Sequence, residues 1–340
     1  MARPAKVIEG VTFENIPFDR LFAGEEPVVL KGLVKDWPIV QAAGKSPKAV
    51  MDYLASFYND KPTITYIGEA SIKGRFAYNE DLTGFNFSSE RCNVLDVFKL
   101  IEQNVGKSEH PYYYMNSIMV DESFPGMRQE NDLNFNHPDF DKYPHIAKIW
   151  IGSESRASCH SDTPRNIACC VQGDRRFTLF PPNQIQNLYP GPLTPTPGGQ
   201  TVTMTDIQQP DFDKFPRLKE ALDNAVIAEM EPGDALYYPS LWWHEVDALD
   251  KFNVMINYWW IDAPRYLGDP LDVLMHAMLT LRDRSPSEKK AWREIFDYYI
   301  FGDADKVRDH LPEHTWGALG PMDQDRARRL IMQVRQSLNR

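Results

Sequence analysis

Two residues with metal-binding side chains, His160 and Asp162, are separated by a single residue in a segment with strand character. In an extended chain, residues i and i+2 point to the same face, so the imidazole and the carboxylate can converge on one point. Together they would supply two of the three protein ligands of a metal site. The triplet alone is a weak signal, because roughly one histidine–x–carboxylate triplet is expected by chance in a chain of this composition.

His244 can supply the third ligand. It follows a turn at Pro232-Gly233, an apolar strand and a second turn, and returning antiparallel strands can bring it beside the pair. Two histidines and one carboxylate, with open positions left on the metal, form the facial triad of non-haem Fe(II) oxygenases. A catalytic zinc site can use the same ligands, so the ligand set alone does not decide the metal.

A predicted hairpin adds an arginine to the same face. The turn sequence at 173–174 separates two β runs and sets Gln172 opposite Arg175. Because side chains alternate, Asn166 and Arg175 then share one face, which also carries His160 if the strand continues backwards. An arginine on that face is costly unless it meets an anion, and a dicarboxylate cosubstrate would supply one. The alternative is an arginine at the barrel mouth, paired with a nearby aspartate or left in solvent.

The remaining polar residues of this kind carry less information. Asn257 lies inside the apolar run 253–260 and, if buried, needs either a ligand or another side chain as partner. Surface or structural roles are expected for the histidines near prolines, in polar loops or in helices: His110, His137, His145, His276, His310 and His314. The cysteines form no CxxC pattern and are expected to be buried thiols in a reducing compartment: Cys92, Cys159, Cys169 and Cys170.

Composition describes an ordinary globular chain. Of its 340 residues, 42% are hydrophobic and 25% are charged. No apolar run approaches the roughly 18 to 20 residues that span a bilayer, and the first residues have no apolar core of a secretory signal. We therefore expect a cytoplasmic protein without a membrane partner. The net charge of −11 argues against binding long stretches of nucleic-acid backbone.

The elements that must position these side chains fall into three groups. The first 145 residues mix helices and strands, and we expect helices at 46–58 and 93–103 and strands at 27–34, 64–67, 75–78 and 112–120, followed by a polar loop at 121–145. Short strands separated by Gly and Pro turns come next, at 146–151, 165–172, 175–180, 226–230, 234–238 and 253–260. They predict an antiparallel barrel or jelly roll in which the long loop 190–216 is functional. Helical patterns continue from 263 to the end.

An ordered set of motifs resembles the cupin-like Jumonji-C family of Fe(II)- and 2-oxoglutarate-dependent oxygenases. It comprises HSD at 160–162, Asn166, GDR at 173–175, FTLFPPNQIQNLYP, EPGDALYYPSLWWHEV and NVMINYWW. The similarity is strong over about 145–262, and PVVLKGLVKDWP at 27–38 also looks like the start of that family's domain. Within the family, the chain is most similar to the branch of the asparaginyl hydroxylase that acts on the hypoxia-inducible factor.

The resemblance implies a double-stranded β-helix whose iron is held by His160, Asp162 and His244. It also implies a cosubstrate pocket lined by Asn166 and Asn257. Tyr114 matches a tyrosine that hydrogen-bonds the 2-oxoglutarate carboxylate, although Tyr112 and Tyr113 are alternatives, and Trp259 matches an aromatic residue near the site. The chain departs from the family twice: Arg175 stands where a lysine is usual, and Ala157 replaces a threonine.

These observations combine into one prediction. We expect a mainly β fold, a cupin or jelly roll at 1–262 with its core at 110–262, N-terminal α/β additions and a helical segment at 263–340 that forms a homodimer. We expect a hydroxylase that uses Fe(II), 2-oxoglutarate and dioxygen, releases succinate and CO2, and acts on a protein side chain or a small metabolite. The alternatives are a non-catalytic metal-binding cupin acting as a sensor or scaffold, and a zinc-dependent hydrolase or isomerase on the same fold.

Overall fold

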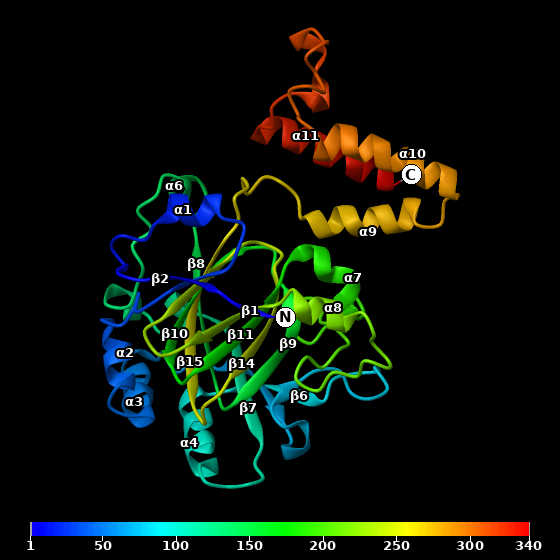
Figure 1. Ribbon diagram of the computed structural model, residues 1–340. Helices are drawn as coiled ribbons and strands as arrows, with labels where there is room; N and C mark the ends of the chain where they lie inside the picture. Colours follow the sequence, from blue (N-terminus) through cyan, green and yellow to red (C-terminus); the bar gives the residue numbers. More distant parts are fainter. Residues whose placement is uncertain (1, 340) are drawn as a thin grey trace. The chain divides into compact units, whose positions relative to one another are not determined.

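The computed structural model describes residues 2–339, which divide into two compact units. The first unit ends at Ile261 and the second begins at Asp262. Figure 1 shows the first unit as two β-sheets with helices around them, and the second as helices joined by loops. The candidate ligands all belong to the first unit.

Fifteen strands are seen in the described part of the first unit. They are β1 (Arg3–Pro4), β2 (Lys6–Ile8), β3 (Val28–Leu30), β4 (Thr63–Gly68), β5 (Arg75–Phe76), β6 (Phe87–Cys92), β7 (Tyr112–Met119), β8 (Ile146–Gly152), β9 (Ser155–Ser161), β10 (Arg165–Gln172), β11 (Arg175–Phe180), β12 (Val226–Met230), β13 (Ala235–Tyr238), β14 (Trp243–Ala248) and β15 (Asn253–Trp260). One sheet has the order β1-β12-β11-β14-β9-β5, and the other has the order β2-β3-β13-β10-β15-β8-β7-β4-β6. From β8 to β15 the chain changes sheet at every step except from β11 to β12, which agrees with the predicted mainly β jelly-roll fold.

The predicted hairpin at 173–174 is wrong. Strand β10 pairs with β13 and β15, whereas β11 pairs with β12 and β14 in the other sheet. The turn therefore carries the chain from one sheet to the other, and Gln172 is not the partner of Arg175. The reason lies in burial: every residue of β10 after Arg165 is buried, so the strand is central in its sheet and covered on both faces.

Two strands that carry candidate ligands were absent from the predicted strand list. Strands β9 and β14 read SRASCHS and WHEVDA, so polar residues interrupt the apolar alternation that identifies a strand. The other predicted strands of the barrel agree with the structure within a residue or two. The segment 121–145, predicted to be a polar loop, contains short helical pieces: the end of α5 (Val120–Ser123), a 3₁₀ turn (Met127–Gln129) and α6 (Asp139–Lys142).

The helices of the first unit begin where the sequence places caps. In α3 (Pro47–Phe57) the Ser46 side chain accepts a hydrogen bond from the Ala49 backbone N–H, and in α4 (Val94–Asn104) Asn93 accepts one from Leu95. The other helices are short: α1 (Phe18–Ala23), α2 (Pro38–Ala43), α7 (Ile185–Leu188) and α8 (Leu218–Asp223), with 3₁₀ turns at Ala70–Ile72 and Pro182–Gln184.

Three apolar clusters hold the first unit together. The largest joins α2, α3 and α4 to the outward side chains of the nine-stranded sheet, such as Ile149, Ile167 and Ile256. A second fills part of the space between the sheets with residues such as Phe177 and Leu236, and the third covers the outer face of the smaller sheet. Because the interior cluster leaves the His244 end of the barrel polar, the side chains at that end are available for chemistry.

The second unit consists of α9 (Pro270–Leu281), α10 (Pro286–Phe296), a π-helical turn (Asp297–Phe301), two 3₁₀ turns (Glu313–Thr315 and Gly317–Leu319) and α11 (Gln324–Leu338). Ser285 and Glu288 form a capping box at the start of α10. Among the described residues, no helix combines the length and the apolar character that a membrane crossing needs.

Candidate metal centre

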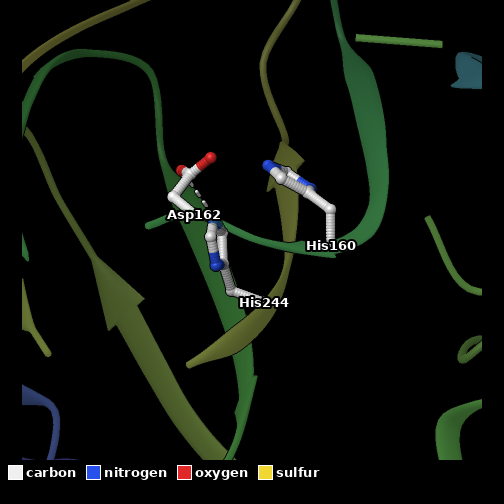
Figure 2. Close-up of side chains that lie close together, drawn as sticks. All are labelled: His160, Asp162 and His244. Atoms are coloured by element: carbon white, nitrogen blue, oxygen red, sulfur yellow. Dashed lines mark ion pairs between the residues drawn. The ribbon is translucent and has the colours of Figure 1, made fainter. Parts of the chain in front are cut away.

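Three residues gather at one end of the barrel. His160 lies in β9, Asp162 just beyond it, and His244 in β14, which pairs with β9 so that the two histidines are Cα partners. Figure 2 shows the three side chains converging. One potential ligand atom of each residue lies within 4.8 Å of the other two. Asp162 and His244 are buried, and His160 is half-buried.

An irregularity in β9 directs His160 inward. The register opposite β14 shifts, so that Ser158 and Cys159 together face the single residue Glu245. As a result, Ala157 and His160 both point into the barrel although they are three positions apart, and Cys159 packs in the apolar cluster outside the sheet. The Ser158 hydroxyl donates to the Phe76 carbonyl at 3.0 Å, so it does not replace the threonine hydroxyl absent at Ala157.

Backbone carbonyls hold both imidazoles in one orientation. His160 Nδ1 lies 2.8 Å from the Ser158 carbonyl oxygen, and His244 Nδ1 lies 3.0 Å from the Trp242 carbonyl oxygen. A carbonyl can only accept, so each Nδ1 must carry the proton, and each Nε2 is left as an unprotonated donor for a metal. The same arrangement serves metal-bound histidines generally, because the outer hydrogen bond fixes the tautomer.

The third member, Asp162, fits a cation between these rings. Its Oδ2 lies 3.6 Å from His244 Nε2, and its buried Oδ1 has no hydrogen-bond partner among the described residues. Burial raises the pKa of Asp162, and burial together with His160 lowers the pKa of His244. A buried carboxylate oxygen without a partner, facing two imidazole nitrogens, is the donor set that a divalent metal requires.

Arg175 enters the same space from β11, a strand of the same sheet as β9 and β14. Its side chain, only 4% exposed, lines a cavity together with the three triad residues, and we call this space the Arg175 cavity. Among the described residues it forms no ion pair, its Nε has no partner, and it interacts with the Cys170 thiol and with Tyr114. Asp247 attracts it only from a longer distance. A buried guanidinium without a carboxylate is costly unless a ligand brings the anion.

The three other predicted cosubstrate residues line this cavity as well. Tyr114 lies on its wall, whereas Tyr113 packs in the helix-covered core and Tyr112 contacts His110, so Tyr114 is the tyrosine that the structure brings to the site. Burial raises the pKa of Tyr114 although the positive charge of Arg175 opposes the change, so its hydroxyl remains a hydrogen-bond donor at neutral pH.

Asn166 and Asn257 belong to a hydrogen-bonded chain that sequence reasoning did not find. Trp150 Nε1 donates to Asn257 Oδ1 at 2.7 Å, and Asn257 Nδ2 donates to Asn166 Oδ1 at 3.2 Å. Asn166 Nδ2 donates to the Tyr238 hydroxyl, which lies 3.4 Å from His244 Nε2. This series of hydrogen bonds fixes the orientation of both amides and connects them to His244, a candidate metal ligand. The sequence places Tyr238 on a strand. It does not show which side of the sheet the tyrosine faces, because that depends on how the strand pairs with its neighbours.

A second cavity borders the triad. It has a volume of about 240 Å³, and we call it the Lys148 cavity. His160, Asp162 and Trp259 border both cavities, whereas Lys148 and Ser117 line only this one. The loop 190–216, predicted to be functional, supplies Pro197, Gly198, Gln200 and Val202 to its wall. Trp259, predicted to be near the site, is therefore shared by both spaces.

Fold and site together define a jelly-roll protein with a candidate centre for a single metal ion. A profile of the cupin-like domain family matches residues 15–266, so the chain belongs to this family, in its Jumonji-C group. The family prediction is thereby confirmed.

Three relatives show the range of this similarity. Lysine-specific demethylase JMJ31 of Arabidopsis thaliana is 31% identical over 113 residues, which cover 33% of this chain and 20% of that protein. HSPB1-associated protein 1 of Homo sapiens is 35% identical over 113 residues, with 33% and 22% covered. tRNA wybutosine-synthesizing protein 5 of Gallus gallus is 24% identical over 323 residues, with 90% and 88% covered. The chain thus matches about a fifth of the length of the first two relatives. These names do not support the branch of the hypoxia-inducible factor asparaginyl hydroxylase.

Proposed function

We propose that the protein is an Fe(II)- and 2-oxoglutarate-dependent oxygenase, most simply a hydroxylase. The observation that carries the proposal is the buried, unpaired Arg175 guanidinium in a cavity that also holds His160, Asp162 and His244. A metal triad leaves positions for further ligands, and an arginine beside it recognises a carboxylate. A metabolite that both chelates a metal and carries a distal carboxylate matches this pair of features.

Each residue has a distinct task in this proposal. Bound Fe(II) would supply the redox chemistry that converts 2-oxoglutarate, dioxygen and a C–H bond into succinate, CO2 and a hydroxylated product. Arg175 would bind the distal carboxylate of the cosubstrate, with the Tyr114 hydroxyl as a second donor. Asn166 and Asn257, held by Trp150 and Tyr238, would fix the position of the bound molecule through oriented amides. The aromatic walls exclude water from the reacting atoms.

Two alternative functions use the same ligands. A non-catalytic cupin that binds a metal as a sensor or scaffold has no need for a buried arginine beside the metal, so Arg175 argues against it. A zinc-dependent hydrolase or isomerase uses the same triad, and the metal itself distinguishes it. Metal analysis of protein purified without oxygen is the test: stoichiometric zinc that resists exchange with Fe(II) would favour the zinc enzyme.

The first prediction concerns metal removal. Protein stripped with a chelator is expected to release no succinate from 2-oxoglutarate under air, because the triad supplies the protein ligands that we propose for the metal. Adding back Fe(II) is expected to restore succinate release, while Zn(II) at the same concentration should not. The measurement is succinate by mass spectrometry, with and without cell extract as a source of substrate. Iron-independent or absent turnover, together with failure to bind 2-oxoglutarate, would reject the oxygenase.

The substrate remains a protein side chain or a small metabolite in this proposal. A net charge of −11 argues against a nucleic acid, although one relative is named for tRNA modification. Two relatives are named lysine-specific demethylases, so N-demethylation is the main alternative to stable hydroxylation. The product decides: a retained oxygen adds the mass of one oxygen atom, whereas demethylation removes a methyl group. The assignment to the asparaginyl hydroxylase branch would require an asparagine product.

We also propose that a second copy of the chain covers the helical unit. Large apolar side chains are exposed on its helices and its π-helical turn, including Leu279 at 80% and Phe301 at 76%. A single copy rarely leaves so many apolar groups in water, and a closed pair of copies is the commonest way to bury them.

The second prediction tests this dimer. Wild-type protein is expected to have twice the mass of the 39.2 kDa chain, and the double variant Leu279→Glu and Phe301→Glu is expected to shift to a single chain. Burying a charge in an apolar interface carries a large penalty, which drives the shift. Light scattering after gel filtration gives both masses. Leu249→Glu, an exposed leucine of the first unit, is the control and should remain dimeric. A wild type that runs as one chain would contradict the proposal.

A further inference from the structure

The two cavities beside the triad each have their own cation. Arg175 and Asn257 line only the Arg175 cavity, and Lys148 and Ser117 line only the Lys148 cavity, while the metal ligands His160 and Asp162 border both. If the cosubstrate binds at Arg175, the Lys148 cavity is the remaining space from which another molecule can reach the same metal. Its polar groups then define what that molecule looks like.

Lys148 faces this space because of its place in β8. Ala147, Ile149 and Ile151 pack in the helix-covered core, so the alternate residues Lys148 and Trp150 point between the sheets. Lys148 Nζ donates to Ser117 Oγ at 2.6 Å and lies 4.3 Å from the centre of the Trp259 ring. In the described part of the chain it has no ion-pair partner. The hydrogen bond to Ser117 uses one of its three N–H groups, so two remain for a ligand.

Ser117 is brought to Lys148 by an irregular backbone. The pairing of β7 with β8 shifts between Met115 and Ile118, and Ser117 adopts a left-handed φ of 54°. Serine rarely adopts this conformation, and such residues concentrate at functional sites. Since Ser117 Oγ accepts from the lysine, its own hydroxyl proton is free to be donated to a bound molecule.

Trp259, which borders both cavities, carries a further hydrogen-bond donor. Its indole Nε1 is buried and has no hydrogen-bond partner among the described residues. Lysine, serine and tryptophan thus all offer hydrogens, and Asp162 of the triad is the one carboxylate that lines the cavity within residues 2–339. Asp162 attracts Lys148 electrostatically, but a metal bound by the triad would take up that negative charge. The lysine would then be left to a ligand.

We propose that Lys148, Ser117 and Trp259 bind an anionic group of the prime substrate, a carboxylate or a phosphate monoester. This inference rests on the proposed oxygenase function, because only that function gives the second cavity a substrate. Docking the anion at Lys148 holds a neighbouring C–H bond of the substrate beside His160 and Asp162. The lysine is therefore a specificity-determining residue for the substrate and takes no part in holding the cosubstrate.

The test uses two pairs of probes whose main-chain ends are blocked, so that each pair differs mainly in one side-chain charge: N-acetyl-L-aspartate α-amide with N-acetyl-L-asparagine α-amide, and N-acetyl-O-phospho-L-serine amide with N-acetyl-L-serine amide. Binding to the full chain loaded with Mn(II), with and without 2-oxoglutarate, is followed by the tryptophan fluorescence that Trp259 should contribute and by calorimetry. At least one anionic probe is expected to bind about tenfold or more tightly than its neutral partner, in line with a charge-assisted hydrogen bond. The pair that discriminates tells a carboxylate from a phosphate source.

Three variants complete the experiment. Lys148→Gln is expected to abolish the preference for the anion while changing the affinity for 2-oxoglutarate less than about twofold, and Lys148→Arg should retain part of the preference. Lys142→Gln, which removes an exposed lysine, is the charge-matched control and should behave as wild type.

The outcomes separate this proposal from the oxygenase itself. Equal binding of charged and neutral probes, an unchanged preference in Lys148→Gln, or a loss of 2-oxoglutarate affinity in that variant would each overturn the role of Lys148. If 2-oxoglutarate fails to bind wild type while Lys148 still selects the anionic probe, the proposed oxygenase fails and the anion site stands.

Discussion

Replacing Arg175 by glutamine is expected to weaken 2-oxoglutarate binding by roughly 30-fold or more, because losing one partner of a buried, hydrogen-bonded charge pair costs about 2–5 kcal/mol. Metal binding should be unchanged, since Arg175 lies in β11 and none of the triad residues does. Calorimetry of 2-oxoglutarate with the Mn(II)-loaded protein gives the affinity, and metal analysis gives the loading.

The neighbouring arginine supplies the control. Arg176 points to the other face of β11, where its Nε donates to Glu229 at 2.7 Å and the side chain is about half exposed. Arg176→Gln is therefore expected to bind 2-oxoglutarate as wild type does. Arg175→Lys, which installs the residue usual in the family, is expected to keep binding within about tenfold, because the charge remains but paired hydrogen bonding is lost. If Arg175→Gln bound the cosubstrate normally, the oxygenase proposal would lose its main support.

The triad could be predicted from the sequence because metal binding depends on the types of the side chains. Imidazole and carboxylate side chains are strong metal ligands, and extended backbone places His160 and Asp162 on one side. The third residue, His244, was placed near them by expecting antiparallel strands to return. The structure brings all three together, although the irregular register of β9, which lets Ala157 and His160 share a face, has no signal in the sequence.

The position of Arg175 was predicted for the wrong reason. A hairpin would have put Asn166 and Arg175 on one face of one sheet, but they stand on two facing sheets and meet across the interior. Strand alternation predicts which side chains point inward, and the inward orientation predicted for Asn166 and Arg175 is confirmed. Pairing depends on which apolar runs are central in their sheets, and a two-residue turn between fully buried strands can either close a hairpin or cross between sheets.

Lys148 shows where sequence reasoning stops. Apolar residues occupy alternate positions of the run Ile146–Gly152, because one face of β8 packs against the helix-covered core. From the sequence alone, Lys148 on the other face could equally be a surface lysine. Only the placement of helices over Ile149 and Ile151 shows that Lys148 points inward. The same holds for Tyr238 and Trp150, whose hydrogen bonds to Asn166 and Asn257 join distant strands.

Replacing His160 by alanine is expected to reduce Fe(II) affinity by about 100-fold or more, because even losing an outer hydrogen bond to a metal ligand typically costs 10–100-fold. Succinate release should fall to the level of metal-free protein. Folding should be preserved, since the side chain lies half-buried at the cavity wall and the apolar clusters do not include it. The measurements are metal analysis after anaerobic loading, succinate release, and thermal unfolding of the metal-free protein.

The control for this variant is His310→Ala, which removes an imidazole whose side chain is 61% exposed in the helical unit and lies far from the triad in sequence. It should load Fe(II) and release succinate as wild type does. Because the two imidazoles of the triad are held by separate carbonyls, alanine at His160 leaves His244 oriented by Trp242. Two ligands then remain, and a site with two ligands competes poorly with water for iron. Undiminished iron loading of His160→Ala would place the metal elsewhere, and the assignment of both cavities would have to be abandoned with it.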